Sequence, residues 1–150
     1  MAIKQLSVFV ENKPGMLYDI FKKMSDAGIN MRAMSVADTK DFGVLRLIVS
    51  DNAKAKEAFG EDTIVADTDV IAVEMGDTAG ALCKVVESLG KNGINIEYAY
   101  AFTASKEIGA YTVLRVDHVP EAEKILKETG FPEELVVNRS RSCVEKQLRL

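Results

Sequence analysis

The stretch FVENKPGMLYDIFKKMSDAGIN, residues 9–30, recurs as EMGDTAGALCKVVESLGKNGIN, residues 74–95. The two copies align Gly15 with Gly80, and both end in Gly-Ile-Asn. Their separation is 65 residues throughout (80 − 15). A repeat of this length indicates two like structural units, so a binding site built on one unit is expected to occur twice.

A half-buried strand is predicted at the start of each unit, because apolar and polar residues alternate there. In the first unit it covers residues 3–10, with Gln5 and Ser7 on the face opposite the apolar side chains. The corresponding strand of the second unit carries Ile71, Val73 and Met75.

An amphipathic helix follows in each unit, because apolar residues recur at the +3, +4 and +7 spacing. These residues are Leu17, Ile20, Phe21 and Met24 in the first unit and Leu82, Val85, Val86 and Leu89 in the second. Either Asn12 or Asp77 can cap the start of its helix, and Pro14 suits a first helical turn. Gly28 and Gly93 fall at the helix ends, where a residue without Cβ tolerates the left-handed conformation.

Two further strands, a second helix and a short strand complete each unit. We expect them at residues 31–37, 44–49, 53–59 and 63–66 in the first unit, and at 96–102, 110–116, 120–128 and 134–137 in the second. Aligning Gly43 with Gly109 widens the separation to 66 in the hairpin loop, where one extra residue is tolerated. The order βαββαβ predicts an α+β fold of two ferredoxin-like repeats, each with both helices on one face of an antiparallel sheet.

The composition is that of a soluble globular protein, and we expect a cytoplasmic location because the chain has neither a secretion signal nor a membrane-length apolar run. The chain has 150 residues, and half of it is too short to fold well alone, so we expect the units to pack on each other or on a second chain. A formal net charge of −4 argues against nucleic acid as the main partner. The sequence shows no secretion signal and no apolar run of membrane length.

Signatures of catalysis are absent from the sequence. Cys83 and Cys143 form no disulfide framework and no metal-binding pattern, and Cys83 lies close to an apolar stripe, which predicts a small buried or half-buried residue. The single histidine, His118, is expected to cap a helix or face solvent. No nucleophile, phosphate-loop or metalloprotease motif occurs, so we predict no enzyme activity, no cofactor and no metal.

The turn between the first strand and the first helix carries the functional content. Its residues are Glu11, Asn12, Lys13, Pro14, Gly15, Met16 and Leu17. Glycine lets the backbone approach a small ligand, and the helix N-terminus behind it favours a carboxylate. Asn30, after the helix, can aim a second amide toward a neighbouring unit. Alternatively, Asn12 caps the helix and Asn30 closes a turn; local chemistry leaves both interpretations open.

The pattern N-x-P-G-x-L after an apolar strand, then an amphipathic helix and G-I-N, is similar to the ACT domain. This module regulates many enzymes of amino-acid metabolism. The resemblance covers residues 1–66 and 69–137 and leaves 138–150 as a C-terminal extension. It implies that a small amino acid binds between two ACT units placed side by side, whose sheets can join into one of eight strands. It also implies a non-catalytic protein that modulates a separate partner.

The resemblance carries over to the second unit less completely. The matching residues there are Asp77, Thr78, Ala79, Gly80, Ala81, Leu82 and Asn95. A carboxylate at Asp77 would repel the carboxylate of an amino acid but attract its ammonium group, by roughly 4 kcal/mol at ~4 Å before desolvation. We therefore expect two inequivalent sites, with the primary site in the first unit.

A scaffold that kept the fold and lost the ligand is the alternative function, and Asp77 and Ala79 favour it for the second unit. A homodimer is expected, because an ACT sheet leaves one face uncovered. Aromatic residues suited to such a face are Phe9, Tyr98, Tyr100 and Phe102. Packing against another sheet is the favoured role of the last three, over a stacking platform for a ligand.

Overall fold

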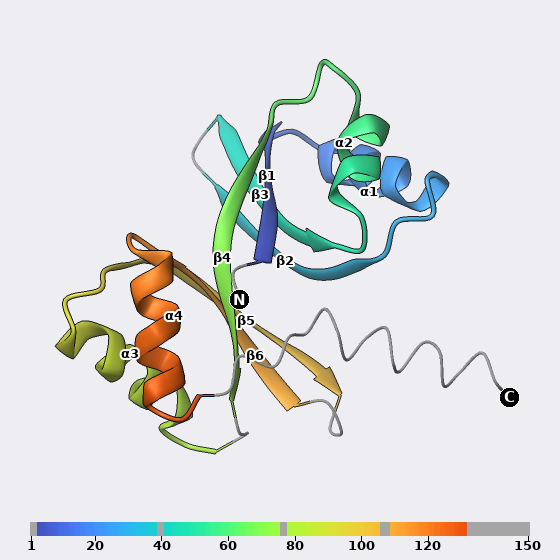
Figure 1. Ribbon diagram of the computed structural model, residues 1–150. Coiled ribbons are helices and arrows are strands. Elements are labelled where there is room, and N and C mark those ends of the chain that lie inside the picture. Colours follow the sequence, from blue (N-terminus) through green and yellow to red (C-terminus); the bar gives the residue numbers. More distant parts are fainter. Residues whose placement is uncertain (1–2, 39–40, 76–77, 106–108, 132–150) are drawn as a thin grey trace, which may run out of the picture. The chain divides into compact units, whose positions relative to one another are not determined.

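The described residues form two compact units, which divide between Thr68 and Asp69 (Figure 1). The computed structural model describes residues 3–38, 41–75, 78–105 and 109–131. Each unit has the α+β composition that the repeat predicts, so the fold class is confirmed.

The elements follow the predicted order. They are β1 (Ile3–Glu11), α1 (Met16–Asp26), β2 (Met31–Asp38), β3 (Phe42–Val49), α2 (Asn52–Phe59), β4 (Val65–Met75), α3 (Ala81–Lys91), β5 (Ile96–Ser105), β6 (Gly109–Val116) and α4 (Val119–Glu128). Strand order is β2-β3-β1-β4 in the first unit and β4-β6-β5 in the second. All pairings between these strands for which the register is known are antiparallel.

Strand β4 replaces two predicted strands. The expected short strand at residues 63–66 and the strand carrying Ile71 are one continuous strand of 11 residues, which begins in the first unit and ends in the second. Within the first unit its start lies beside β1, because the N–H of Phe9 donates to the carbonyl of Ile64 (3.0 Å). The predicted strand at 134–137 lies outside the described residues, and the eight-stranded sheet stays a prediction.

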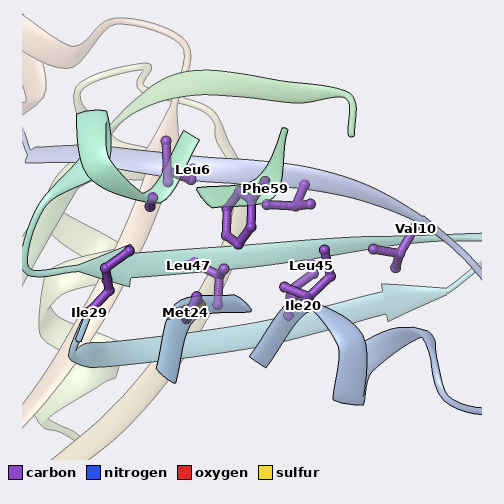
Figure 2. Close-up of a cluster of buried hydrophobic side chains, with 10 residues drawn as sticks. Leu6, Val10, Ile20, Met24, Ile29, Leu45, Leu47 and Phe59 are labelled. Carbon is purple, nitrogen blue, oxygen red and sulfur yellow. The ribbon is translucent and has the colours of Figure 1, made fainter. Parts of the chain in front are cut away.

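Each unit has its own apolar core between one sheet face and two helices. Figure 2 shows the core of the first unit, where side chains from the strands meet those of α1 and α2. The members of this core are Leu6, Val8, Val10, Ile20, Met24, Ile29, Leu45, Leu47, Ala55 and Phe59. The core of the second unit contains the corresponding residues of α3 and α4, Val85, Leu89, Ala122 and Leu126. Of the predicted helical stripes, Ile20 and Met24 in α1 and Val85 and Leu89 in α3 are buried. Leu17 (36%), Leu82 (42%) and Val86 (43%) are exposed, which corrects the prediction for these positions.

The separation between the repeats grows to 67 residues after the hairpin, and the predicted 66 is wrong. Leu6 pairs with Leu47 in the first unit, and Ile71 pairs with Leu114 in the second. The first members of these pairs differ by 65 and the second members by 67 (114 − 47). Because side chains alternate between sheet faces, an insertion of two residues keeps every side chain on its face, whereas one residue would reverse them.

The polar side chains of β1 are buried, which corrects the prediction of a half-buried strand. Gln5 is fully buried and Ser7 is 8% exposed, although both lie opposite the apolar core face. Their polar atoms have partners: Gln5 Nε2 donates to Ser7 Oγ (3.1 Å), and Ser7 Oγ lies 3.2 Å from Thr68 Oγ1. Alternation predicts which face a side chain takes but not whether that face is covered.

Glycines end the first helix of each unit as expected. Gly28 has φ +65°, and the N–H groups of Gly28 and Ile29 donate to the carbonyls of Ser25 and Met24 (both 2.9 Å). This pair of bonds is a Schellman motif, and Met24 and Ile29 make its apolar contact in the core. The motif at Gly93 is equivalent. It fixes the direction in which the chain leaves each helix, and therefore the positions of Asn30 and Asn95.

Candidate functional site

The β1–α1 turn is a type II turn closed on glycine. The N–H of Met16 donates to the carbonyl of Lys13 (3.4 Å), so Pro14 is the second residue of the turn and Gly15 is the third. Gly15 has φ +91° and ψ −22°, close to the values for the third residue of a type II turn. A residue with a Cβ adopts this conformation only under strain, so glycine is required here.

The β4–α3 turn repeats this geometry with different residues. The N–H of Ala81 donates to the carbonyl of Thr78 (3.1 Å), and Gly80 has φ +86° and ψ −2°. Alanine replaces proline at the second position. Asp77, predicted to distinguish this site by its charge, lies outside the described residues.

Glycine itself occupies the N-cap of both helices, which corrects the predicted caps. Helix α1 begins at Met16, directly after Gly15, and no side chain in the described part of the chain caps it. Asn12 is three residues too early to cap, and its backbone N–H donates to the carbonyl of Asp41 (3.1 Å). Pro14 likewise belongs to the turn and not to the first helical turn. The first N–H groups of α1 have no intrahelical acceptor, and the positive end of the helix dipole lies there.

Charge at the first turn comes from Lys13. Its ammonium group pairs with the carboxylate of Glu11, and the two side chains are 67% and 48% exposed. An ion pair this exposed contributes little to stability, about 0–1 kcal/mol. The lysine can therefore exchange its partner for an anionic ligand at small cost.

Backbone hydrogen bonds hold Asn30 and Asn95, the asparagines that follow α1 and α3. The N–H of Asn30 donates to Ser50 Oγ (3.1 Å), and the N–H of Ser50 donates back to the Asn30 carbonyl (2.9 Å). These bonds join Asn30 to Ser50 through the Asn30 main chain and do not close a turn, which is the structural role that the sequence suggested. The residue is exposed, and its backbone bonds leave the side-chain amide for another role.

Asn95 is held in the same way by a charged residue. Its N–H donates to Asp117 Oδ1 (3.1 Å), and the N–H of Asp117 donates to the Asn95 carbonyl (3.2 Å). Desolvation raises the pKa of Asp117, but its hydrogen bonds with the His118 side chain and the Asn95 N–H outweigh this, and the pKa is lowered. No motif in the sequence indicates Asp117, whose counterpart in the first unit is the neutral Ser50.

Helix α1 separates the two halves of the predicted site. It has 11 residues between the turn and the Schellman motif, which correspond to about 16 Å at 1.5 Å per residue. A small amino acid is much shorter than this distance. Asn12 and Asn30 of one unit therefore cannot contact the same ligand.

Two cavities of the first unit adjoin predicted site residues. One of about 560 Å³ lies along α1 and is lined by Glu11 and Met16 together with charged residues such as Asp19 and Lys22. Another of about 300 Å³ lies beside Asn30 at the opposite end of the helix. Its apolar walls come from α1, Ile29 and the first residue of β2, and the Gly28-Ile29-Asn30 motif lines it.

Residues expected to have no catalytic role are exposed. His118 precedes α4 with 63% of its side chain exposed, and its Nδ1 lies 3.2 Å from Asp117 Oδ1. Cys83 is exposed, which corrects the prediction of a buried residue, because α3 turns this position outward. Over residues 3–38, 41–75, 78–105 and 109–131, no three His, Cys, Asp or Glu side chains are grouped to hold a metal ion. None of the helices in these ranges has the length and apolar character to cross a membrane.

Two units, each with a glycine-capped helix after its first strand and then two strands and a second helix, define a pair of ACT domains. The chain belongs to the ACT domain pair family, which it matches over residues 1–137. Among curated proteins none matches the sequence.

Solved structures share the fold. The crystal structure of protein BT0572 from Bacteroides thetaiotaomicron is 37% identical, with a TM-score of 0.81 over 87% of this chain and 90% of that chain. The ligand-free regulatory subunit of aspartate kinase from Thermus thermophilus is 15% identical, with a TM-score of 0.61 over 85% of this chain and 92% of that chain. At this identity the second likeness extends to the fold alone.

Proposed function

We propose that the chain is a non-catalytic module that binds a small amino acid and modulates a separate partner in amino-acid metabolism. The observation that carries the proposal is the β1–α1 turn, where a glycine cap leaves the N-terminus of α1 open beside Lys13. The ligand carboxylate would accept hydrogen bonds from the first N–H groups of the helix. A carboxylate at a helix N-terminus gains about 0.3–1 kcal/mol, and up to ~2 kcal/mol when partly buried.

A second ACT unit would supply the remaining contacts, because α1 separates Asn30 from the turn of its own unit. We propose that this unit belongs to a second copy of the chain. Strand β2 ends the strand order of the first unit, and along the described residues nothing pairs with its outer side. It is eight residues long and exposes Met34 (38%) and Val36 (41%). A long apolar edge of this kind favours pairing with another strand.

Antiparallel pairing of two β2 strands would bring the required groups together. Glu11 pairs with Phe42, and Asp38 pairs with Gly43, so the turn and the end of β2 lie at the same end of the sheet. Asn30 precedes Met31, which pairs with Val49 at the opposite end. A two-fold axis between the two β2 strands makes them antiparallel. Asn30 of one copy then lies at the end of the sheet where the other copy has its β1–α1 turn.

Regulation requires that the amino acid bind two packing states with different affinity, since equal affinity shifts nothing. A micromolar sensor needs about −8 kcal/mol, within reach of several hydrogen bonds and one oriented charge. The regulatory subunit of aspartate kinase, which has the same fold, supports a regulatory role by analogy only.

Titration calorimetry with the twenty L-amino acids tests the proposal on the full chain, with D-enantiomers as controls. We expect one L-amino acid, or a few related ones, to bind, and light scattering to give the mass of a dimer. Folded protein that releases no heat with any of them would favour the ligand-independent scaffold. Turnover by the isolated protein would contradict the non-catalytic role.

A further inference from the structure

The cavity beside Asn30, called here the Asn30 cavity, combines apolar walls with a polar end. Phe21, Met24, Ile29 and Met31 form its walls. Its polar side chains are Ser25 and Asn30, and no charged side chain of the described residues lines it. Its volume of about 300 Å³ is at the lower end for small-molecule sites.

Charge distinguishes the Asn30 cavity from the larger cavity of the same unit. That cavity, of about 560 Å³, is bordered by four carboxylates and two lysines, among them Asp26, Lys23 and Asp62. A charged group that entered the Asn30 cavity would lose its water without gaining a counter-charge, which is strongly unfavourable. An apolar group would gain from the same transfer.

We infer that the bound amino acid has an uncharged, apolar side chain, and that this side chain enters the Asn30 cavity. The α-amino and α-carboxylate groups then lie between the Asn30 amide and the Lys13–Met16 turn of the other copy. This inference rests on the proposed function and adds to it the class of ligand.

The walls of the cavity are partly fixed and partly adaptable. Met24 (3% exposed) and Ile29 (7%) are anchored in the core and by the Schellman bond between them. Met31 is 43% exposed, and methionine adjusts readily to ligands of different shape. The cavity therefore selects against charge more strongly than it distinguishes one apolar side chain from another.

The second repeat offers a matched control. In the aligned sequences Phe21 corresponds to Val86, and Ser25 corresponds to Gly90. A Cβ added at Gly90 would meet no atom within 4 Å, so a side chain fits there without steric conflict. The same charge can thus be placed at the same position of either repeat.

Calorimetry of the full chain with leucine, methionine, aspartate and lysine tests the ligand class. We expect leucine or methionine to bind at least about tenfold more tightly than either charged amino acid. Tighter binding of aspartate or lysine overturns the inference and leaves the proposed function intact. If none of the twenty amino acids binds, both this inference and the proposed function are wrong.

Ser25→Asp and Gly90→Asp locate the side-chain site. Ser25 is exposed, so Ser25→Asp is expected to fold, which circular dichroism checks. The added charge is expected to lower the affinity for the apolar amino acid at least about tenfold. Gly90→Asp, with the same added charge, is expected to leave affinity unchanged. Met31→Glu places a charge on the opposite wall and should reproduce the loss. Wild-type affinity in Ser25→Asp and Met31→Glu, or a loss confined to Gly90→Asp, overturns the inference.

Discussion

The Lys13–Met16 turn and the Thr78–Ala81 turn have the same backbone but different chemistry. Their central glycines share φ near +90°, and each glycine caps the helix that follows. The preceding residue is proline in one and alanine in the other. Both turns keep glycine at the position of positive φ, whereas the neighbouring residues differ in charge and stiffness. Two repeats can therefore keep one fold and differ in ligand binding.

The largest effect is expected from giving the first turn the charge of the second. Asn12→Asp introduces the carboxylate that Asp77 provides in the second repeat. At ~4 Å its repulsion of a ligand carboxylate is roughly 4 kcal/mol before desolvation and screening, so we expect affinity to fall at least about tenfold. Calorimetry measures this loss, with Asn12→Gln as the neutral control. Unchanged affinity in Asn12→Asp would place the ligand carboxylate elsewhere.

Removing the glycines tests whether the two turns are equivalent in structure. A Cβ at Gly15 or Gly80 meets no atom within 4 Å, so the cost of alanine is conformational, about 1–2 kcal/mol. We expect Gly15→Ala and Gly80→Ala to lower the free energy of unfolding in urea by similar amounts. Only Gly15→Ala should lower the affinity for the amino acid. Equal losses of binding would make the two turns functionally alike.

Exchanging proline and alanine has a smaller effect on stability. Ala79→Pro should raise the free energy of unfolding by about 0.4–1 kcal/mol, because proline restricts the unfolded chain at a position that Pro14 shows to be compatible. Pro14→Ala should lower it by a similar amount. Urea denaturation of both variants checks the signs. A destabilised Ala79→Pro would show that the two turns differ in backbone at this position.

The smallest effect is expected at Asp117, which replaces the neutral Ser50. Its pKa in the folded chain is lowered from an ordinary value of 3.8. Its stabilising contribution is therefore present above pH 3.8 and lost as the pH falls through the lower pKa of the folded state. Asp117→Ser should be less stable than wild type at pH 7, and the difference should shrink on acidification. Thermal melts between neutral and acidic pH measure it, and a difference that grows would contradict the assignment.

Much of the fold was predictable because helical and strand periodicities follow directly from the pattern of apolar residues. The hairpin was not, since Gly43 and Gly109 look equivalent, whereas the pairing of Leu47 and Leu114 with their partners reveals the two-residue insertion. The burial of Gln5 depends on what covers the sheet, which periodicity does not contain.

The sequence indicates residues for the candidate site, and their role in binding stays a prediction, whereas the geometry of the site comes only from the structure. The sequence indicates Gly15 as a point of close approach, but not that it displaces Asn12 as the cap. The predicted helix ends already separate Gly15 from Asn30, and the length of α1 is the basis on which we propose that two units share one site. The residues that line the Asn30 cavity all fall within residues 21–31, but their sequence pattern does not show that they enclose a cavity.

Mixing two variants tests the central claim that one ligand lies between the turn of one copy and Asn30 of the other. Gly15→Ala and Asn30→Ala should each bind the amino acid poorly. After subunit exchange, an equal mixture forms mixed dimers with one intact site, and calorimetry should recover about a quarter of the wild-type binding capacity. A mixture that binds no better than either variant alone would contradict the account.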